Sequence, residues 1–314
     1  MMDYLKIGIS ACLIGKKVRY DGSHKQDHYL TDTLGRFINW IPLCPEVEAG
    51  LPIPRKPMHL EGDLESPRIV LNKTREDITG TINKRIAYKI KELKKEDISG
   101  FIFKSGSPSC GIREIKVYDP QVKKTRMGKG IFALAFMKEF PNIPVEDEKA
   151  LYDPHKRENF LERVVGYKRW VDFKRSKKTI KNLIDFHSRQ KYNLMAHSQE
   201  HLILLGRLVA SAKDYSIKEI FDKYEGLYLE ALTKKATPAK HYNTLQHIIG
   251  YLKKHLIMKE LEELREALEG YRKGKLPLII PITLINHYVR MFNIEYLKNQ
   301  YYLNPEYMML TIPG

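Results

Sequence analysis

The hydrophobic pattern changes character near residue 150, and this change constrains the fold more than any other feature of the chain. Before that point, short β-rich runs alternate with stretches of helical spacing. The runs expected as strands are 6–14, 37–45, 100–106, 114–119 and 142–147, and helical spacing occurs at 31–38, 82–97 and 129–140. Such alternation is typical of βαβ units. The pattern predicts an α/β, Rossmann-like domain with a parallel sheet over residues 1–150.

After residue 150 the strand signals stop and only helical periodicity remains. The expected helices lie within 157–173, 177–197, 198–213, 216–235 and 236–256. The polar segment 147–159 contains a proline and is a plausible linker. We therefore expect an all-α domain over residues 151–314.

The composition indicates an ordinary soluble protein with reduced thiols. The chain has 314 residues and only three cysteines, and its N-terminus lacks the pattern of a secretion signal. Its longest apolar run, at 276–285, contains prolines and is too short to span a bilayer. These features predict a cytoplasmic protein without a membrane partner.

The net charge of +16 favours a polyanionic partner. Residues 1–150 carry 26 Lys and Arg against 20 Asp and Glu, a balance of +6, and residues 151–314 carry 28 against 18, a balance of +10. Such an excess favours binding to the phosphates of a nucleic acid. The alternative is a lysine-rich surface that serves only solubility or a hot habitat.

Each of the three cysteines lies near the end of a predicted strand or just after it. Cys12 ends the first, Cys44 the second, and Cys110 follows the strand at 100–106. Because the carboxyl ends of parallel strands line one crevice, the three thiols can converge although they are far apart in sequence. Three thiolates suit a zinc ion or an iron–sulfur cluster. The alternative is that each cysteine is simply a small buried hydrophobe.

Three motifs in the first half closely resemble those of the TudS-type thiouracil desulfidases. They are GISACLIGKKVRYDGSHK (8–25), CPEVEAGLPIPR (44–55) and SGSPSCG (105–111). The second half is similar to the YbgA domain at FHSRQKYNLMAHS (186–198), KHYNTLQHIIGYLKK (240–254) and YRKGKLPLIIPITL (271–284). The order of the two domains resembles the RudS-type proteins, which act on 4-thiouridine in tRNA.

The resemblance implies a [4Fe–4S] cluster held by Cys12, Cys44 and Cys110, with one iron open to the sulfur of a thiolated uracil. Soft sulfur prefers such a metal, and water can attack the adjacent ring carbon without net electron transfer. Glu46 matches the catalytic glutamate of the family and Ser107 its catalytic serine. Ser109 is close enough to exchange roles with Ser107 and is a further candidate for contact with the substrate.

The loop after Cys12 is rich in hydrogen-bond donors. Arg19, Asp21 and Lys25 are candidates for contact with a base or phosphate, and Arg55 is ambiguous in the same way. A simple turn fixed by Asp21 and Gly22 is the alternative interpretation.

A basic run in the second half is the candidate RNA grip. Residues 167–181 hold seven Lys and Arg against one Asp, interleaved with Trp170 and Phe173. Cations neutralise phosphates and exposed rings stack on unpaired bases, although rings three residues apart can also form a buried helical stripe. The cations assigned to RNA are Lys168, Arg169, Lys174, Arg175, Lys177 and Lys178.

Three functional hypotheses follow. The first is a tRNA 4-thiouridine desulfidase, and the second is a desulfidase of free thiouracil whose helical half serves assembly. The third is a non-enzymatic RNA-binding or stress module whose cysteines hold a structural metal.

Overall fold

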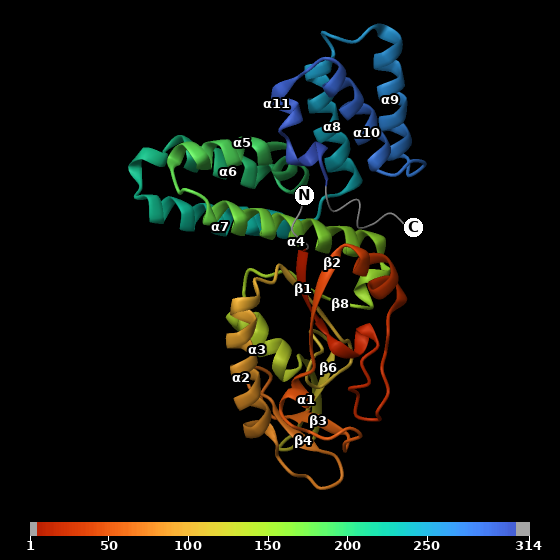
Figure 1. Cartoon of the computed structure of the whole chain (residues 1–314), viewed down its shortest axis with the longest axis vertical. Coiled ribbons are helices and arrows are strands. Elements are labelled where there is room, and N and C mark those ends of the chain that lie inside the picture. Colours follow the sequence, from red (N-terminus) through yellow and green to blue (C-terminus); the bar gives the residue numbers. More distant parts are fainter. Residues whose placement is uncertain (1–4, 306–314) are drawn as a thin grey trace. The chain divides into compact units, whose positions relative to one another are not determined.

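The computed structural model describes residues 5–305 (Figure 1). The chain forms two compact units that divide between Lys168 and Arg169, later than the boundary expected at residue 150. The division falls inside helix α4 (Pro154–Arg175), so the segment 147–159 is not an open linker. The first half of α4 packs on the sheet of the first unit: a Cβ at Gly100 would lie 2.7 Å from Val164.

A four-stranded parallel sheet organises the first unit. It consists of β1 (Leu5–Ser10), β2 (Ile38–Leu43), β5 (Gly100–Phe103) and β8 (Val145–Asp147), in the order β2-β1-β5-β8. All three pairings are parallel. The predicted α/β class with a parallel sheet is confirmed.

A second sheet of mixed direction was not expected. It contains β3 (Met58–Glu61), β4 (Arg68–Leu71), β6 (Ile115–Asp119) and β7 (Lys124–Gly128), in the order β4-β3-β6-β7. The run at 114–119 is a strand, as predicted, but β6 belongs to this sheet, where it pairs parallel to β3 and antiparallel to β7. The strand β7 was not predicted because its residues are exposed and mostly polar, so they show no apolar alternation.

Two helices cover the core of the first unit. In α2 (Thr79–Glu96) the predicted apolar stripe of Ile82, Ile86, Ile90 and Leu93 is buried. With α3 (Ile131–Glu139) it packs in one core that includes the rings of β5. The expected helix at 31–38 is instead a π turn (Tyr29–Thr33) followed by a 3-10 turn (Leu34–Arg36).

The second unit is helical throughout its described residues, as predicted. After α4 come α5 (Ile180–His197), α6 (Gln199–Ala210), α7 (Ile217–Thr233) and α8 (Pro238–Leu252). They are followed by α9 (Met258–Arg272), α10 (Ile279–Met291) and α11 (Glu295–Lys298). Among residues 5–305, no helix combines the length and apolar character that crossing a membrane requires.

Candidate active site

The three cysteines meet at one edge of the parallel sheet. Cys12 lies in a 3-10 turn (Ala11–Ile14) directly after β1, and Cys44 is the residue between β2 and helix α1 (Pro45–Glu48). Cys110 lies in the loop that follows β5. Because β2, β1 and β5 are adjacent and parallel, their carboxyl ends bring the three thiols into the lining of one cavity of about 400 Å³.

Burial keeps these thiols protonated. It raises the pKa of Cys12 to about 11 and also raises the pKa of Cys44 and of Cys110. Charge repulsion from Cys44 raises the pKa of both Cys12 and Cys110, which shows that the three thiols are electrostatic neighbours. A bound metal must therefore displace their protons, as thiolate ligation requires.

The three thiols of the cavity are the donor type that would hold an iron–sulfur cluster. Within residues 5–305, no three His, Cys, Asp or Glu side chains lie close enough together to share one metal ion. An iron–sulfur cluster is larger, and each of its cysteine ligands binds a different iron. Three thiols around one cavity fit a four-iron cluster with one iron left without a protein ligand.

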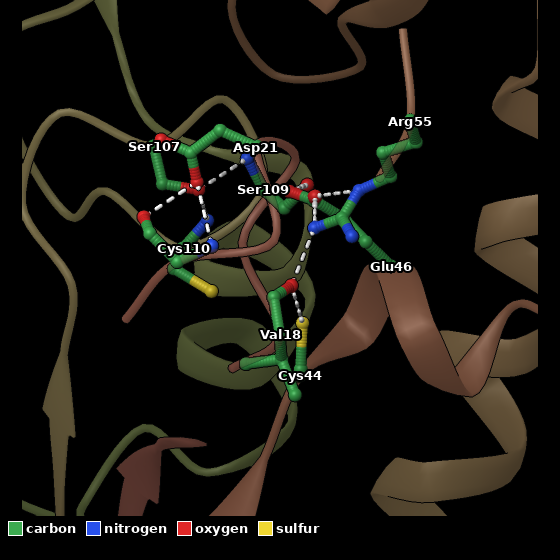
Figure 2. Close-up of polar contacts among 9 residues, drawn as sticks. Val18, Asp21, Cys44, Glu46, Arg55, Ser107, Ser109 and Cys110 are labelled. Atoms are coloured by element: carbon green, nitrogen blue, oxygen red, sulfur yellow. Dashed lines mark hydrogen bonds and ion pairs between the residues drawn. The ribbon is translucent and has the colours of Figure 1, made fainter. Parts of the chain in front are cut away.

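Glu46 is the buried carboxylate of the cavity. It occupies the first turn after Cys44 and is 8% exposed. Ser109 donates a hydrogen bond to its Oε1 at 2.8 Å, and the Arg55 Nε donates to its Oε2 at 2.7 Å (Figure 2). Arg55 also donates through Nη2 to Glu46 and, at 2.9 Å, to the carbonyl oxygen of Val18. Both carboxylate oxygens are thus held in place at the rim of the thiol cluster.

The two serines before Cys110 have different surroundings. Ser107 lines the cavity, and its Oγ accepts hydrogen bonds from the backbone N–H groups of Ser109 at 3.2 Å and Cys110 at 3.1 Å. Ser109 is wholly buried, is not among the described residues that line the cavity, and donates to Glu46. Ser109 thus lies behind the cavity lining and is hydrogen-bonded to Glu46, and its contact with a substrate stays a prediction.

The candidate residues in the loop after Cys12 also differ in whether they line the cavity. Arg19 and Lys25 line the cavity, and their contact with a substrate stays a prediction. Asp21 is not among the described residues that line it. The Asp21 Oδ1 accepts hydrogen bonds from the backbone and hydroxyl of Ser23, which lower the pKa of Asp21. Asp21 fixes the turn, which was the alternative interpretation of its motif.

A second buried ion pair at the cavity was missed by sequence reasoning. The ammonium of Lys104, which lines the cavity, donates to Glu148 at 2.5 Å, and the backbone N–H of Ser105 donates to the same carboxylate at 2.8 Å. Burial opposes ionisation of Glu148, but its bonds with Lys104 and Ser105 outweigh burial and lower its pKa. The position of Lys104 just after a strand was the only available signal, since Glu148 lies 44 residues away.

The basic run of the helical unit is less exposed than expected. Trp170 is 0% exposed and lies in an aromatic cluster, 5.4 Å from Tyr224 and 5.5 Å from Phe186 between ring centroids. Phe173 stacks on Phe186 at 4.5 Å. Trp170 is therefore a core residue and is not available to RNA bases, whereas Phe173 is half-buried in the same aromatic cluster.

The cations of that run differ in their exposure and in their partners. Lys174 pairs with Glu225 at 2.7 Å, Arg175 lies 4.0 Å from Asp172, and the Arg169 guanidinium lies over the ring of Tyr301. Lys168 is half-buried at the end of the first unit. Lys177 and Lys178 are exposed. The assignment of the six cations to RNA stays a prediction.

Comparison with known proteins accounts for both halves. Residues 7–148 match the 2-thiouracil desulfurase family, and residues 191–306 match DUF1722, a family of unknown function. The uncharacterized protein YbgA of Escherichia coli (strain K12) is 32% identical over 121 residues, which cover 38% of this chain and 72% of YbgA. The uncharacterized protein YbbK of Bacillus subtilis (strain 168) is 29% identical over 108 residues, or 33% of this chain and 71% of YbbK.

A solved structure of the [4Fe-4S]-dependent thiouracil desulfidase TudS is 31% identical to this chain. The match covers 48% of this chain and 94% of that one, with a TM-score of 0.39.

The protein is thus a two-domain fusion whose cysteine-bearing half is an enzyme domain of the desulfurase class. The chain belongs to the 2-thiouracil desulfurase family through its N-terminal half and to the DUF1722 family of YbgA through its C-terminal half. The fusion predicted from the sequence motifs is confirmed.

Proposed function

We propose that this protein removes sulfur from thiolated uracil by hydrolysis, with a [4Fe–4S] cluster held by Cys12, Cys44 and Cys110. One observation carries the proposal: three free thiols and a buried, doubly held carboxylate line the same cavity of about 400 Å³. Family membership and the printed activity of TudS support the same reaction.

In the proposed reaction a thiocarbonyl and water give a carbonyl and hydrogen sulfide, so no electron donor is consumed. The cluster, when bound, supplies a soft metal position for the thiocarbonyl sulfur. Glu46 accepts the proton of the attacking water, and the proton balance closes when two protons have passed from water oxygen to sulfur. Arg55 and Ser109 hold Glu46 in one orientation, because each oxygen of its carboxylate receives a hydrogen bond.

Ser107 is proposed to position the substrate or the water. Its Oγ accepts two backbone hydrogen bonds, and no group among residues 5–305 accepts the proton of this hydroxyl. The hydroxyl can therefore donate into the cavity, either to a ring carbonyl of the base or to the attacking water.

We further propose 4-thiouridine in tRNA as the substrate. The helical half carries +10 of the net charge of +16, and Lys177 and Lys178 are exposed on it. A base in folded RNA must be swung out to enter a cavity of this size. The competing substrate is free thiouracil, and one observation favours it: Trp170 is a core residue, Phe173 packs against Phe186 and Lys174 is paired, so much of the basic run serves the fold.

The test uses anaerobically purified full-length protein and two substrates, tRNA containing 4-thiouridine and free 4-thiouracil. We expect brown protein with about four irons, and a larger kcat/KM on the tRNA. Turnover of the free base with none on tRNA would overturn the tRNA assignment alone. Colourless protein that binds tRNA without releasing sulfide would overturn the enzymatic proposal.

A further inference from the structure

One aromatic side chain stands at the cavity without a role in the chemistry above. Of the described residues that line the cavity, Tyr20 is the single aromatic one. It is 44% exposed, unlike the phenylalanines of β5, which are buried in the core. The cavity lining also includes the apolar residues Val18, Pro57 and Met58. An exposed ring in an otherwise partly apolar cavity offers a flat surface that a ligand can cover.

The backbone that carries this ring is fixed. The carbonyl oxygen of Tyr20 accepts a hydrogen bond from the N–H of Arg55 at 2.8 Å, and Arg55 is itself held by Glu46. On the other side, the N–H of Arg19 donates to the carbonyl oxygen of Ser23 at 3.2 Å, and the Arg19 guanidinium donates to the Ser23 hydroxyl at 2.8 Å. The ring is therefore exposed on a tight, cross-linked turn, so little ordering is needed when a ligand binds.

The turn also places a cation beside the ring. The central carbon of the Arg19 guanidinium lies 5.5 Å from the centroid of the Tyr20 ring. Arg19 and Lys25 line the same cavity, so the ring stands among positive charges that suit the acceptor atoms of a thiolated base and a phosphate attached to it.

We propose that Tyr20 is the stacking platform for the pyrimidine ring of the substrate, a binding residue distinct from the groups that move protons. Stacking recognises the π-face of a base and fixes the plane of its ring, which leaves the choice of the reacting position to the polar groups of the cavity. This inference rests on the proposed function and names how its substrate is held.

The test compares two substrates in wild type and three variants, all full-length and cluster-loaded. The substrates are 4-thiouracil and its 5,6-dihydro analogue, whose saturated ring is puckered and stacks poorly. Two variants, Tyr20→Ala and Tyr20→Phe, change the ring itself. The third, Tyr88→Ala, is the control, because it removes a 52% exposed tyrosine of α2 that is not among the described residues lining the cavity.

We expect Tyr20→Ala to raise the KM for 4-thiouracil roughly 5- to 150-fold, the range that corresponds to losing one base–aromatic stack. The KM for the dihydro analogue should change much less. Tyr20→Phe keeps an aromatic ring and should retain the selectivity between the two substrates, and Tyr88→Ala should behave as wild type. The selectivity between the two substrates is the decisive readout, because a merely structural role of Tyr20 would weaken both equally.

Equal losses on both substrates, or no loss on either, would overturn the stacking role while leaving the desulfidase proposal intact. If wild-type protein turns over neither substrate, the proposed function fails instead. The dissociation constant of uracil, measured by calorimetry for wild type and Tyr20→Ala, then decides the inference: an unchanged constant overturns it and a weakened one supports it.

Discussion

The cysteine cavity and the basic run 167–181 are both candidate functional sites in the sequence. In the structure, the key side chains of the cavity face a shared site, whereas those of the basic run mainly stabilise the helical fold. At the cavity, Glu46 is buried with both oxygens hydrogen-bonded, beside three thiols. In the basic run, Trp170 is buried in an aromatic cluster and Lys174 is paired with Glu225.

The contrast indicates how each kind of motif should be weighed. Burying a carboxylate costs free energy unless it is fully paired, so a buried and paired acid that lines a cavity indicates a selected chemical role. A helix with many cations and rings has a simpler explanation, because its rings can form one core-facing stripe and its cations can lie in solvent. The acid at the cavity is therefore stronger evidence for a function than the cations and rings of the helix are.

The strongest test of this contrast is removal of a thiol. Replacing Cys12, Cys44 or Cys110 by Ala should abolish cluster binding, because two remaining thiolates hold a cluster poorly. The helical unit should stay folded, since its core is separate. Iron analysis and circular dichroism of each variant measure both effects. A variant that retains its full iron content would remove that cysteine from the site.

The next largest effect is expected when Glu46, the proposed general base, is replaced. Glu46→Gln should keep the iron and lower kcat by roughly 10²- to 10⁴-fold, the usual contribution of a general base. Glu48→Gln is the matched control, because Glu48 lies on the same helix, pairs with Lys89 and is not among the described residues that line the cavity.

Replacing the two serines near Glu46 tests the same prediction further. Ser107→Ala should lower turnover because it removes a hydroxyl from the cavity lining, and Ser109→Ala should lower it less, because Arg55 still holds the other oxygen of Glu46. Iron content and kcat together give the readout. Wild-type turnover in Glu46→Gln would show that another group accepts the proton.

The smallest expected effect lies in the helical unit. Reversing Lys177 and Lys178 to Glu should weaken tRNA binding and make its salt slope shallower by about 1 for each phosphate that is no longer neutralised. Lys174→Glu is the control: its ammonium is already held by Glu225, so binding should change less. Filter binding across a salt series measures both. Equal salt slopes in the wild-type and reversed proteins would show that this run is only a solvated face.

The sequence alone was enough to predict the arrangement of the chain and the thiols. Strand and helix periods are local signals, so the change near residue 150, the strands that precede Cys12 and Cys44, and the helices of the second half could all be predicted. Once the strands are parallel, their carboxyl ends share an edge, and the convergence of three distant cysteines follows from topology.

Tertiary structure alone decided which polar groups become partners. Ser109 reaches Glu46 across 63 positions, Lys104 reaches Glu148 across 44, and no local pattern encodes either pair. The burial of Trp170 could not be predicted from the sequence either, because the same spacing of rings fits a buried stripe and an exposed stacking surface. Such choices depend on which surfaces meet after the chain has collapsed, and that is a property of the packed core rather than of any segment within it.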